Sequence, residues 1–409
     1  MNKQQEPRLR FKGFSGAWEE KKIGKIFNVT SGTTPLRSNQ NYFSNGVINW
    51  VKTTDLNNSI LDKTEEKISE IALNETSLKV LPKNTLFVAM YGGFNQIGRT
   101  GLLNMEATCN QALAAILPDK SQNPFYLLTY LNYSVEYWKG IAASSRKDPN
   151  ITKQDVLDFE CFFPSLPEQT HLSLFFRHLD RQIAESRAVL EKSRQLKKAM
   201  LAKMFPANGE KIPQIRFKGF EGEWECRKLG IEVEIIGGGT PDTTNSAYWN
   251  GDIDWYSPTE IGEAAYANGS VKKITLLGLQ KSSAQILPAN RTVLFTSRAS
   301  IGDMAILTKD GSTNQGFQSF VVGERLDVYF FYTMGFKIKD YALKNASGST
   351  FLEISKNTLS QMEFFAPSLK EQTAIGNFFR QLDETIALQS AEVEKLNQIK
   401  KGLLAAMLV

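Results

Sequence analysis

The sequence predicts an α+β protein in which one fold occurs twice in tandem, each copy ending in a long helix. Three observations support this prediction: a repeat that spans both halves of the chain, short strand-like apolar runs, and a heptad pattern at the end of each half. The length of 409 residues agrees with it, because a chain of this size usually holds two or three domains.

The repeat is clearest at the start of each half. The segment PRLRFKGFSGAWEEKKIG at 7–24 aligns with PQIRFKGFEGEWECRKLG at 213–230, an offset of 206 (213 minus 7). Near the end of each half, FFRHLDRQIA at 175–184 aligns with FFRQLDETIA at 378–387, an offset of 203 (378 minus 175). The small change in offset, from 206 to 203, indicates short insertions and deletions in the surface loops between secondary-structure elements that both halves share. The chain is therefore a tandem duplication.

The body of each half alternates strand-like runs with loops. The runs are TLFVAMY at 85–91 and ALAAIL at 112–117, then TVLFTS at 292–297 and FQSFVV at 317–322. Gly, Asn and Pro separate them, and the intervening loops are rich in Ser, Thr, Asn, Gln and Arg. We expect an α+β domain whose strands carry long polar loops.

Each half closes with one long helix. Ser165 followed by Glu168, and Ser368 followed by Glu371, fit the S-x-x-E capping box, in which each side chain bonds the backbone of the other residue. A mostly apolar heptad seam then runs over about 40 residues, or roughly 60 Å of helix. Its positions include Leu172, Phe176 and Lys197 in the first helix, and Ile375, Phe379 and Lys400 in the second. Because a lone helix of that length would expose its seam, we predict that the two helices form a coiled coil. The alternative is two separate helices, each packed on its own domain.

Composition excludes several classes of protein. The sequence has no apolar run long enough to span a membrane and no secretory leader, so we expect a cytoplasmic protein. The three cysteines, Cys109, Cys161 and Cys226, lie too far apart for a zinc site or a disulfide framework. A net charge of +5 permits a polyanionic partner without requiring one.

Catalytic motifs are absent from the sequence. NPFY at 123–126 resembles an amino-methyltransferase box but lacks the second proline, and it is more typical of a helix start. There is no phosphate-binding G-x-x-x-x-G-K-[ST] loop and no nuclease motif after Pro118-Asp119 or Pro241-Asp242. His171 and His178 stand seven residues apart on the first long helix, where packing or solvation is the ordinary role. We therefore predict a non-catalytic chain that binds no metal and no cofactor.

The polar loops are candidates for nucleic-acid contact. Arg and Lys bind phosphates, while Arg, Asn and Gln can also read base edges. The same side chains also form ordinary turns, so one such residue by itself does not identify a DNA contact. The predicted DNA-binding residues are Thr33, Thr34, Arg37, Lys52, Asn95, Arg99, Arg146 and Lys147 in the first half, and Thr240, Thr243, Tyr256, Arg298, Ser300 and Lys344 in the second.

The ordered motifs resemble those of the specificity subunit of type I restriction-modification enzymes. They are the RFKGF opener at 10–14 and 216–220, the loops GTTP at 32–35 and GGTP at 238–241, the NQ pairs at 110–111 and 314–315, ITK at 151–153 with ISK at 354–356, and PSLPEQ at 164–169 with PSLKEQ at 367–372. The resemblance implies two target recognition domains that each read half of a split, asymmetric DNA site, and two spacer helices packed antiparallel. It also implies two modification subunits that use S-adenosylmethionine to methylate adenine, and two restriction subunits that use ATP and Mg for translocation and cleavage.

On this interpretation, residues 1–165 form the first target recognition domain, 166–206 the first spacer helix, 207–368 the second domain and 369–409 the second helix. The duplication then provides a pseudo-two-fold axis, with equivalent docking surfaces for identical partners. Two other interpretations remain. One is a free-standing sequence-specific DNA-binding regulator, and the other is a purely structural coiled-coil adaptor.

Overall fold

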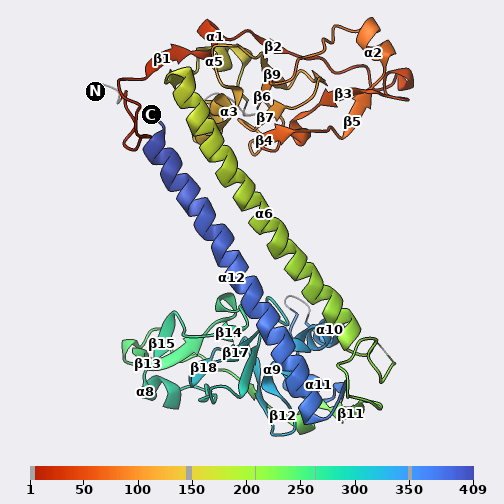
Figure 1. Cartoon of the computed structure of the whole chain (residues 1–409). Helices are drawn as coiled ribbons and strands as arrows, with labels where there is room; N and C mark the ends of the chain where they lie inside the picture. Colours follow the sequence, from red (N-terminus) through yellow and green to blue (C-terminus); the bar gives the residue numbers. More distant parts are fainter. Residues whose placement is uncertain (1–4, 144–149, 208, 263, 349–351) are drawn as a thin grey trace. The chain divides into compact units, whose positions relative to one another are not determined.

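The computed structural model describes residues 5–143, 150–207, 209–262, 264–348 and 352–409 (Figure 1). The chain divides into two units, each with its own core. Unit 1 comprises Met1–Glu185 and Val393–Val409, and unit 2 comprises Ser186–Glu392. Both long helices, α6 (Leu166–Met204) and α12 (Leu369–Met407), contribute residues to each unit.

Unit 1 combines a five-stranded, a three-stranded and a two-stranded sheet, with strand orders β2-β9-β6-β7-β4, β5-β3-β8 and β1-β10. The central strands β6, β7 and β9 are buried throughout, and β6 and β9 confirm two of the predicted strands. The elements are β1 (Glu19–Lys22), α1 (Ile23–Ile26), β2 (Val29–Ser31), β3 (Ile48–Val51), β4 (Ser59–Leu61), β5 (Glu66–Ile68), α2 (Glu70–Glu75), β6 (Leu86–Ala89), β7 (Thr100–Leu103), β8 (Thr108–Cys109), β9 (Leu113–Ile116), α3 (Pro124–Tyr133), α4 (Val135–Ala143), α5 (Lys153–Asp158) and β10 (Glu160–Phe163).

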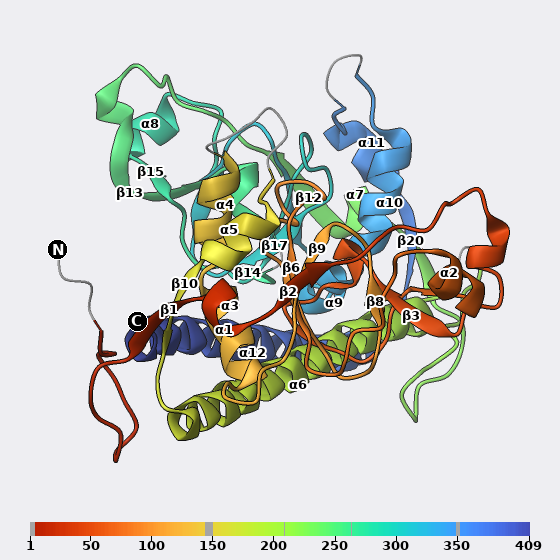
Figure 2. The same cartoon turned by 90° about the horizontal axis from the view of Figure 1, so that it is seen from above.

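Unit 2 repeats this topology, with strand orders β12-β19-β16-β17-β14, β15-β13-β18 and β11-β20. Figure 2 shows α8 beside β13 and β15, with which it makes contacts. The elements are β11 (Glu225–Lys228), α7 (Leu229–Glu232), β12 (Val233–Gly237), β13 (Trp249–Tyr256), β14 (Tyr266–Ala267), β15 (Lys272–Ile274), α8 (Leu276–Gln280), β16 (Thr292–Phe295), β17 (Met304–Leu307), β18 (Gly311–Thr313), β19 (Gln318–Val322), α9 (Val328–Thr333), α10 (Gly335–Asn345), α11 (Lys356–Ser360) and β20 (Glu363–Ala366).

The segment NPFY begins a helix, as predicted. The Asn123 side chain accepts hydrogen bonds from the backbone N–H groups of Phe125 and Tyr126, which caps α3, and Pro124 occupies its first turn. In unit 2, Asp327 caps α9 in the same way through the N–H of Phe330. Short polar side chains at these two positions therefore start equivalent helices.

In each unit, segments of α6 and α12 pack antiparallel. In unit 1, Leu172 and Phe176 of α6 share a core with Met407 and Leu408, and Asp180, further along α6, pairs with the earlier residue Lys400. In unit 2, the ring of Phe205, which follows α6, lies 6.3 Å from that of Phe379 on α12. There Lys197 pairs with Asp383 at 2.5 Å. A later residue of one helix thus meets an earlier residue of the other in both units.

The heptad seam is the less exposed face of both helices, as predicted. Leu172, Phe176, Ile375 and Phe379 are buried. The lysines on the seam, Lys197 and Lys400, are half-buried and face aspartates across the helix pair. The seam therefore admits charge where an opposite charge faces it. Within the described residues, no helix is both long and apolar enough to cross a membrane.

The repeated RFKGF segment anchors the start of each long helix. Arg10 donates two hydrogen bonds of 2.7 Å to Glu168, and Arg216 donates bonds of 2.6 and 2.7 Å to Glu371. Each arginine also bonds the backbone of the Gly-containing turn that follows it, as in the 2.6 Å bond from Arg10 to the carbonyl of Gly16. The bond to Glu168 raises the pKa of Arg10.

Most bonds of the predicted capping boxes do not form, and only one of the four is present among the described contacts. Ser368 does accept a long bond of 3.5 Å from the N–H of Glu371. Both carboxylates of Glu168 and Glu371, however, are occupied by the arginines. A guanidinium forms two charge-assisted hydrogen bonds to a carboxylate, whereas a backbone N–H forms one bond from a neutral donor. A buried carboxylate therefore binds the guanidinium more strongly than it binds the backbone.

Candidate nucleic-acid interface

The GTTP and GGTP loops follow the first strand of each five-stranded sheet and are held by a tryptophan. The indole Nε1 of Trp50 on β3 donates to the carbonyl of Thr33 at 3.2 Å, and that of Trp255 on β13 donates to the carbonyl of Gly239 at 2.8 Å. Both tryptophans are buried. A buried indole N–H needs an acceptor, so the tryptophan and the loop carbonyl fix one another.

The NQ pairs meet these loops. The hydroxyl of Thr34 donates to the amide oxygen of Gln111, and the hydroxyl of Thr240 donates to that of Gln315. Segments that lie far apart in the sequence are thus brought together at the same place in each unit. Of the predicted residues, Thr33, Thr34 and Thr240 belong to this repeated framework and are partly exposed.

The glycines of these loops are required by close backbone approach. A Cβ on Gly238 would lie 1.9 Å from the carbonyl oxygen of Asn314, and one on Gly32 would lie 1.7 Å from that of Cys109. Real Cβ atoms do not come so close to backbone atoms, so any side chain here would displace the loop.

We expect Gly238→Ala to lower the free energy of unfolding by about 1–3 kcal/mol, because it overpacks the loop against backbone. The control is Gly402→Ala on α12, where a Cβ would meet nothing within 4 Å. Alanine there should stabilise by roughly 0.5–1 kcal/mol through helix propensity. Chemical denaturation of both variants measures the difference, and equal midpoints would contradict the close approach.

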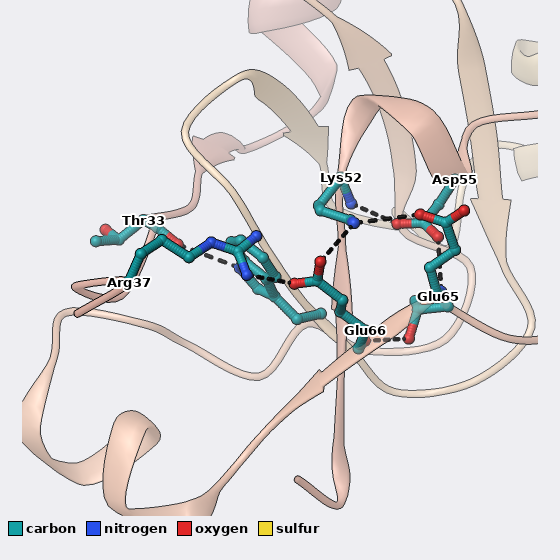
Figure 3. A network of polar contacts seen from close by, with 8 residues as sticks. Thr33, Arg37, Lys52, Asp55, Glu65 and Glu66 are labelled. Carbon is teal, nitrogen blue, oxygen red and sulfur yellow. Dashed lines mark hydrogen bonds and ion pairs between the residues drawn. The ribbon is translucent and has the colours of Figure 1, made fainter. Parts of the chain in front are cut away.

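Two predicted cations of unit 1, Arg37 and Lys52, meet in one polar network (Figure 3). Arg37 donates from Nη1 to Glu66 Oε2 at 2.7 Å, and Lys52 donates to Glu66 Oε1 at 3.0 Å and to Glu65 at 3.2 Å. Asp55 accepts from the backbone N–H groups of Lys52 and Glu65, both at 2.8 Å. Sequence reasoning missed these three carboxylates. The pairing of β3 with β5 brings Glu65 and Glu66 here, while Asp55 lies in the turn directly after Lys52.

The network keeps its charges. Burial alone raises the pKa of Glu66, but hydrogen bonds from Arg37 and Lys52 outweigh it and lower the pKa. Burial alone lowers the pKa of Lys52, but bonds to Glu66 and Glu65 outweigh it and raise the pKa. A lowered carboxylate pKa stabilises the fold above the carboxyl's unfolded-state pKa, and that stabilisation is lost as pH falls through the folded-state value. Glu66 and Lys52 therefore keep their opposite charges at neutral pH.

A second group of predicted residues lies on the loops after β6 and β16. Asn95 is exposed, and Arg99 donates to the Gln96 side chain at 2.7 Å. This loop passes close to the network, because a Cβ on Gly92 would lie 3.3 Å from the hydroxyl of Thr53, the neighbour of Lys52.

In unit 2, the corresponding loop carries Arg298, which is half-exposed, and Ser300, which is exposed. The backbone of Arg298 bridges to Glu353, and the carbonyl of Ser300 accepts a bond from Thr296 at 2.5 Å. The side chain of Thr243, on the loop after β12, is exposed. These three residues remain candidates for DNA contact.

Of the four remaining predicted residues, Tyr256 is corrected by its surroundings, Lys344 lies on a helix, and two lie outside the described residues. Tyr256 is 1% exposed and belongs to a core cluster, because β13 directs it inward, so it cannot contact a ligand. Lys344 lies on α10, where it pairs with Asp340 at 2.7 Å and lines a cavity of about 640 Å³ away from the tryptophan-held loop. Arg146 and Lys147 lie outside the described residues.

The metal-ligating and thiol side chains are scattered over the described part of the chain. No group of three or more His, Cys, Asp or Glu side chains there is placed to hold a metal ion. Cys109 and Cys161 are buried thiols, while Cys226 is exposed. Burial raises the pKa of Cys109 to about 12. A thiol with so high a pKa is a poor nucleophile at neutral pH.

Comparison with known proteins places both halves in one family. The family described as "Type I restriction modification DNA specificity domain" matches residues 16–192 and 221–400. A relative, the type I restriction enzyme MjaIX specificity subunit of Methanocaldococcus jannaschii, is 34% identical over 181 residues, which cover 43% of this chain and 42% of that protein. The match thus spans less than half the length of this relative.

Two solved structures share the fold. The type I restriction-modification S subunit from M. genitalium aligns with a TM-score of 0.63 at 16% identity, covering 99% of each chain. A chain from a structure titled for complex assembly and conformational transition of the type I R-M system aligns with a TM-score of 0.53 at 17% identity, covering 95% of this chain and 96% of that one. These likenesses show that the tandem two-domain fold is shared along nearly the whole chain.

Proposed function

This chain belongs to the family of type I restriction-modification DNA specificity domains, and on that basis we propose that it selects the DNA sequence for a type I restriction-modification complex. One structural observation carries the proposal. The two units hold their GTTP and GGTP loops with the same tryptophan and Thr–Gln bonds but present different side chains from them. Two units that share these bonds but expose different loop side chains are suited to binding two different DNA sequences.

We propose further that each unit reads one half of a split, asymmetric DNA site. Two modification subunits would then methylate adenine in the DNA site that this chain selects, and two restriction subunits would cleave the DNA. The partners would supply S-adenosylmethionine, ATP and Mg, and this cytoplasmic chain would bind none of them and catalyse nothing. The relatives' names and the shared fold support this assignment. They do not favour the free-standing regulator, because specificity subunits are named as parts of an enzyme.

Exchanging the loops of one unit tests the assignment. If loops 33–43 and 91–99 are replaced by those of a relative with another specificity, one half of the methylated motif should change. The other half and the spacer should stay as they were, because unit 2 keeps its own loops. Methylation mapping of cells that express the full system measures the motif. A matched exchange of 239–249 and 298–303 in unit 2 should alter only the other half.

Two results would overturn the proposal. One is a first-unit exchange that rewrites both halves of the motif, which would mean that the units form one composite reader. The other is stable, sequence-specific DNA binding and regulation by the chain in cells without any partner subunit, which would favour the regulator.

A further inference from the structure

Each unit carries a pair of aromatic rings with a cation over it, which we call the aromatic platform. In unit 1 the rings of Phe43 and Trp50 have centroids 6.0 Å apart, and in unit 2 those of Trp249 and Trp255 are 5.0 Å apart. Trp50 and Trp255 are the same residues that hold the GTTP and GGTP loops. The platform therefore lies directly behind the polar loops of each unit.

The backbone frame of the platform is the same in both units. On neighbouring antiparallel strands, Trp50 stands opposite Glu66, and Trp255 stands opposite Lys272. The same register position thus holds an acid in unit 1 and a base in unit 2. The strand pairing is therefore the same in both units, but the side chain opposite the tryptophan has the opposite charge.

The cations that cover the platforms differ as well. In unit 1 the guanidinium of Arg37 lies 4.6 Å from the centroid of Phe43 and 5.0 Å from that of Trp50. In unit 2 the ammonium of Lys272 lies 5.9 Å from the centroid of Trp249. The residue at the position of Arg37 in unit 2 is Thr243, at the offset of 206 that relates Phe43 to Trp249 (249 minus 43).

Arg37 is held in one orientation and is still accessible. Its guanidinium lies close to two rings, and Glu66 accepts one of its N–H groups at 2.7 Å. Glu66 is itself fixed, because its other oxygen binds Lys52. The Arg37 side chain nevertheless remains 53% exposed. A guanidinium has five N–H donors, so the bond to Glu66 leaves others on its exposed edge for a ligand.

The local charge argues against a phosphate as that ligand. The network has two cations, Arg37 and Lys52, and three carboxylates, those of Asp55, Glu65 and Glu66, so its formal charge is −1 (2 minus 3). Phosphate affinity depends on unpaired positive charge. A base edge, in contrast, requires oriented donors, and guanine offers O6 and N7 as paired acceptors to an arginine fork.

We propose that Arg37 reads a guanine in the half-site of unit 1 and that Glu66 positions it. The proposal rests on the proposed function and deepens it, because it names a specificity-determining residue and the base it recognises. Unit 2 has Thr243 and no guanidinium at this position, so it recognises its half-site through other hydrogen-bond donors.

The first test is methylation mapping of the full system with Arg37→Ala, Arg37→Lys and Glu66→Gln. Arg37→Ala and Arg37→Lys should each weaken the requirement for guanine at one position of one half-site. Discrimination between guanine and the other bases at that position should fall roughly ten- to hundred-fold. Lysine keeps the charge but lacks the fork, so it separates base reading from phosphate attraction. Glu66→Gln should give a smaller loss at the same base. Lys79→Ala, an exposed cation of unit 1 outside the network, should leave that guanine requirement unchanged.

The second test uses the assembled complex and duplexes in which single guanines are replaced by 7-deazaguanine, which lacks the N7 acceptor. One replacement should weaken binding by wild type roughly tenfold or more and have little further effect on Arg37→Lys. If every replacement affects both proteins equally, or if Arg37→Lys leaves the motif unchanged, Arg37 does not read guanine. If even the wild-type system methylates no specific motif, it is the proposed function that fails.

Discussion

Arg216→Ala is expected to destabilise unit 2 by roughly 3–5 kcal/mol, because it leaves a buried carboxylate without a counter-ion. The Glu371 side chain is 1% exposed and Arg216 is 15% exposed, so water cannot replace the lost guanidinium. The change also releases the turn carbonyls of Gly222 and Glu221, which Arg216 binds at 2.6 and 3.0 Å. Chemical denaturation, followed by hydrogen exchange of peptides from unit 2, measures the loss.

A surface ion pair of the same unit provides the control. Lys211 and Glu223 lie 2.9 Å apart, but their side chains are 51% and 62% exposed. Lys211→Ala should therefore shift the unfolding midpoint far less than Arg216→Ala does, because water solvates both partners of this pair. Arg10→Ala should reproduce the large effect in unit 1, where Glu168 is 2% exposed. If Arg216→Ala and Lys211→Ala cost the same, the arginine clamp does not anchor the helix.

Leu408→Asp is expected to destabilise unit 1, although Leu408 is the penultimate residue of the sequence. Leu408 is 5% exposed in the core that contains Leu172 and Phe176. Removing a buried leucine side chain alone costs about 2–5 kcal/mol, and a buried carboxylate adds a desolvation penalty. We therefore expect a loss of at least about 3 kcal/mol.

Hydrogen exchange resolved by peptide tests where that loss occurs. Peptides from α3 and β10 should exchange faster in Leu408→Asp, because their core has lost its packing, while peptides from β16 and β20 should change much less. The matched control is Gln398→Asp, an exposed position on α12. It should change stability by less than about 0.5 kcal/mol. Faster exchange confined to unit 2 would show that the end of α12 does not complete the core of unit 1.

Local patterns in the sequence were sufficient to predict much of the fold. The buried strands β6, β9, β16 and β19 lie within the four predicted runs, because strands this apolar are recognisable by composition alone. The long helices begin at Leu166 and Leu369, directly after the predicted serines. The repeat further predicted that the two halves share a frame, and the duplicated Thr–Gln and tryptophan bonds confirm that prediction.

The partners of the charged side chains could not be predicted in this way. Glu66 lies 29 residues from Arg37 in the sequence, and Glu371 lies 155 residues from Arg216. Their pairing depends on strand register and on the path of the chain between them, which no local pattern contains. Tyr256 was predicted to bind DNA as an aromatic residue near the polar loops, but the pleat of β13 turns its ring into the core.

The sequence by itself determined that this protein is a duplication, where its strands and long helices lie, and to which family its motifs belong. These properties follow from periodicity and spacing, which act over a few residues or recur at a constant offset. Only the tertiary structure decided that each core is completed by helix residues from both halves of the sequence, and that the cations of unit 1 are held by carboxylates. Those outcomes depend on burial, since a charge removed from water must find a partner wherever the fold brings one within reach.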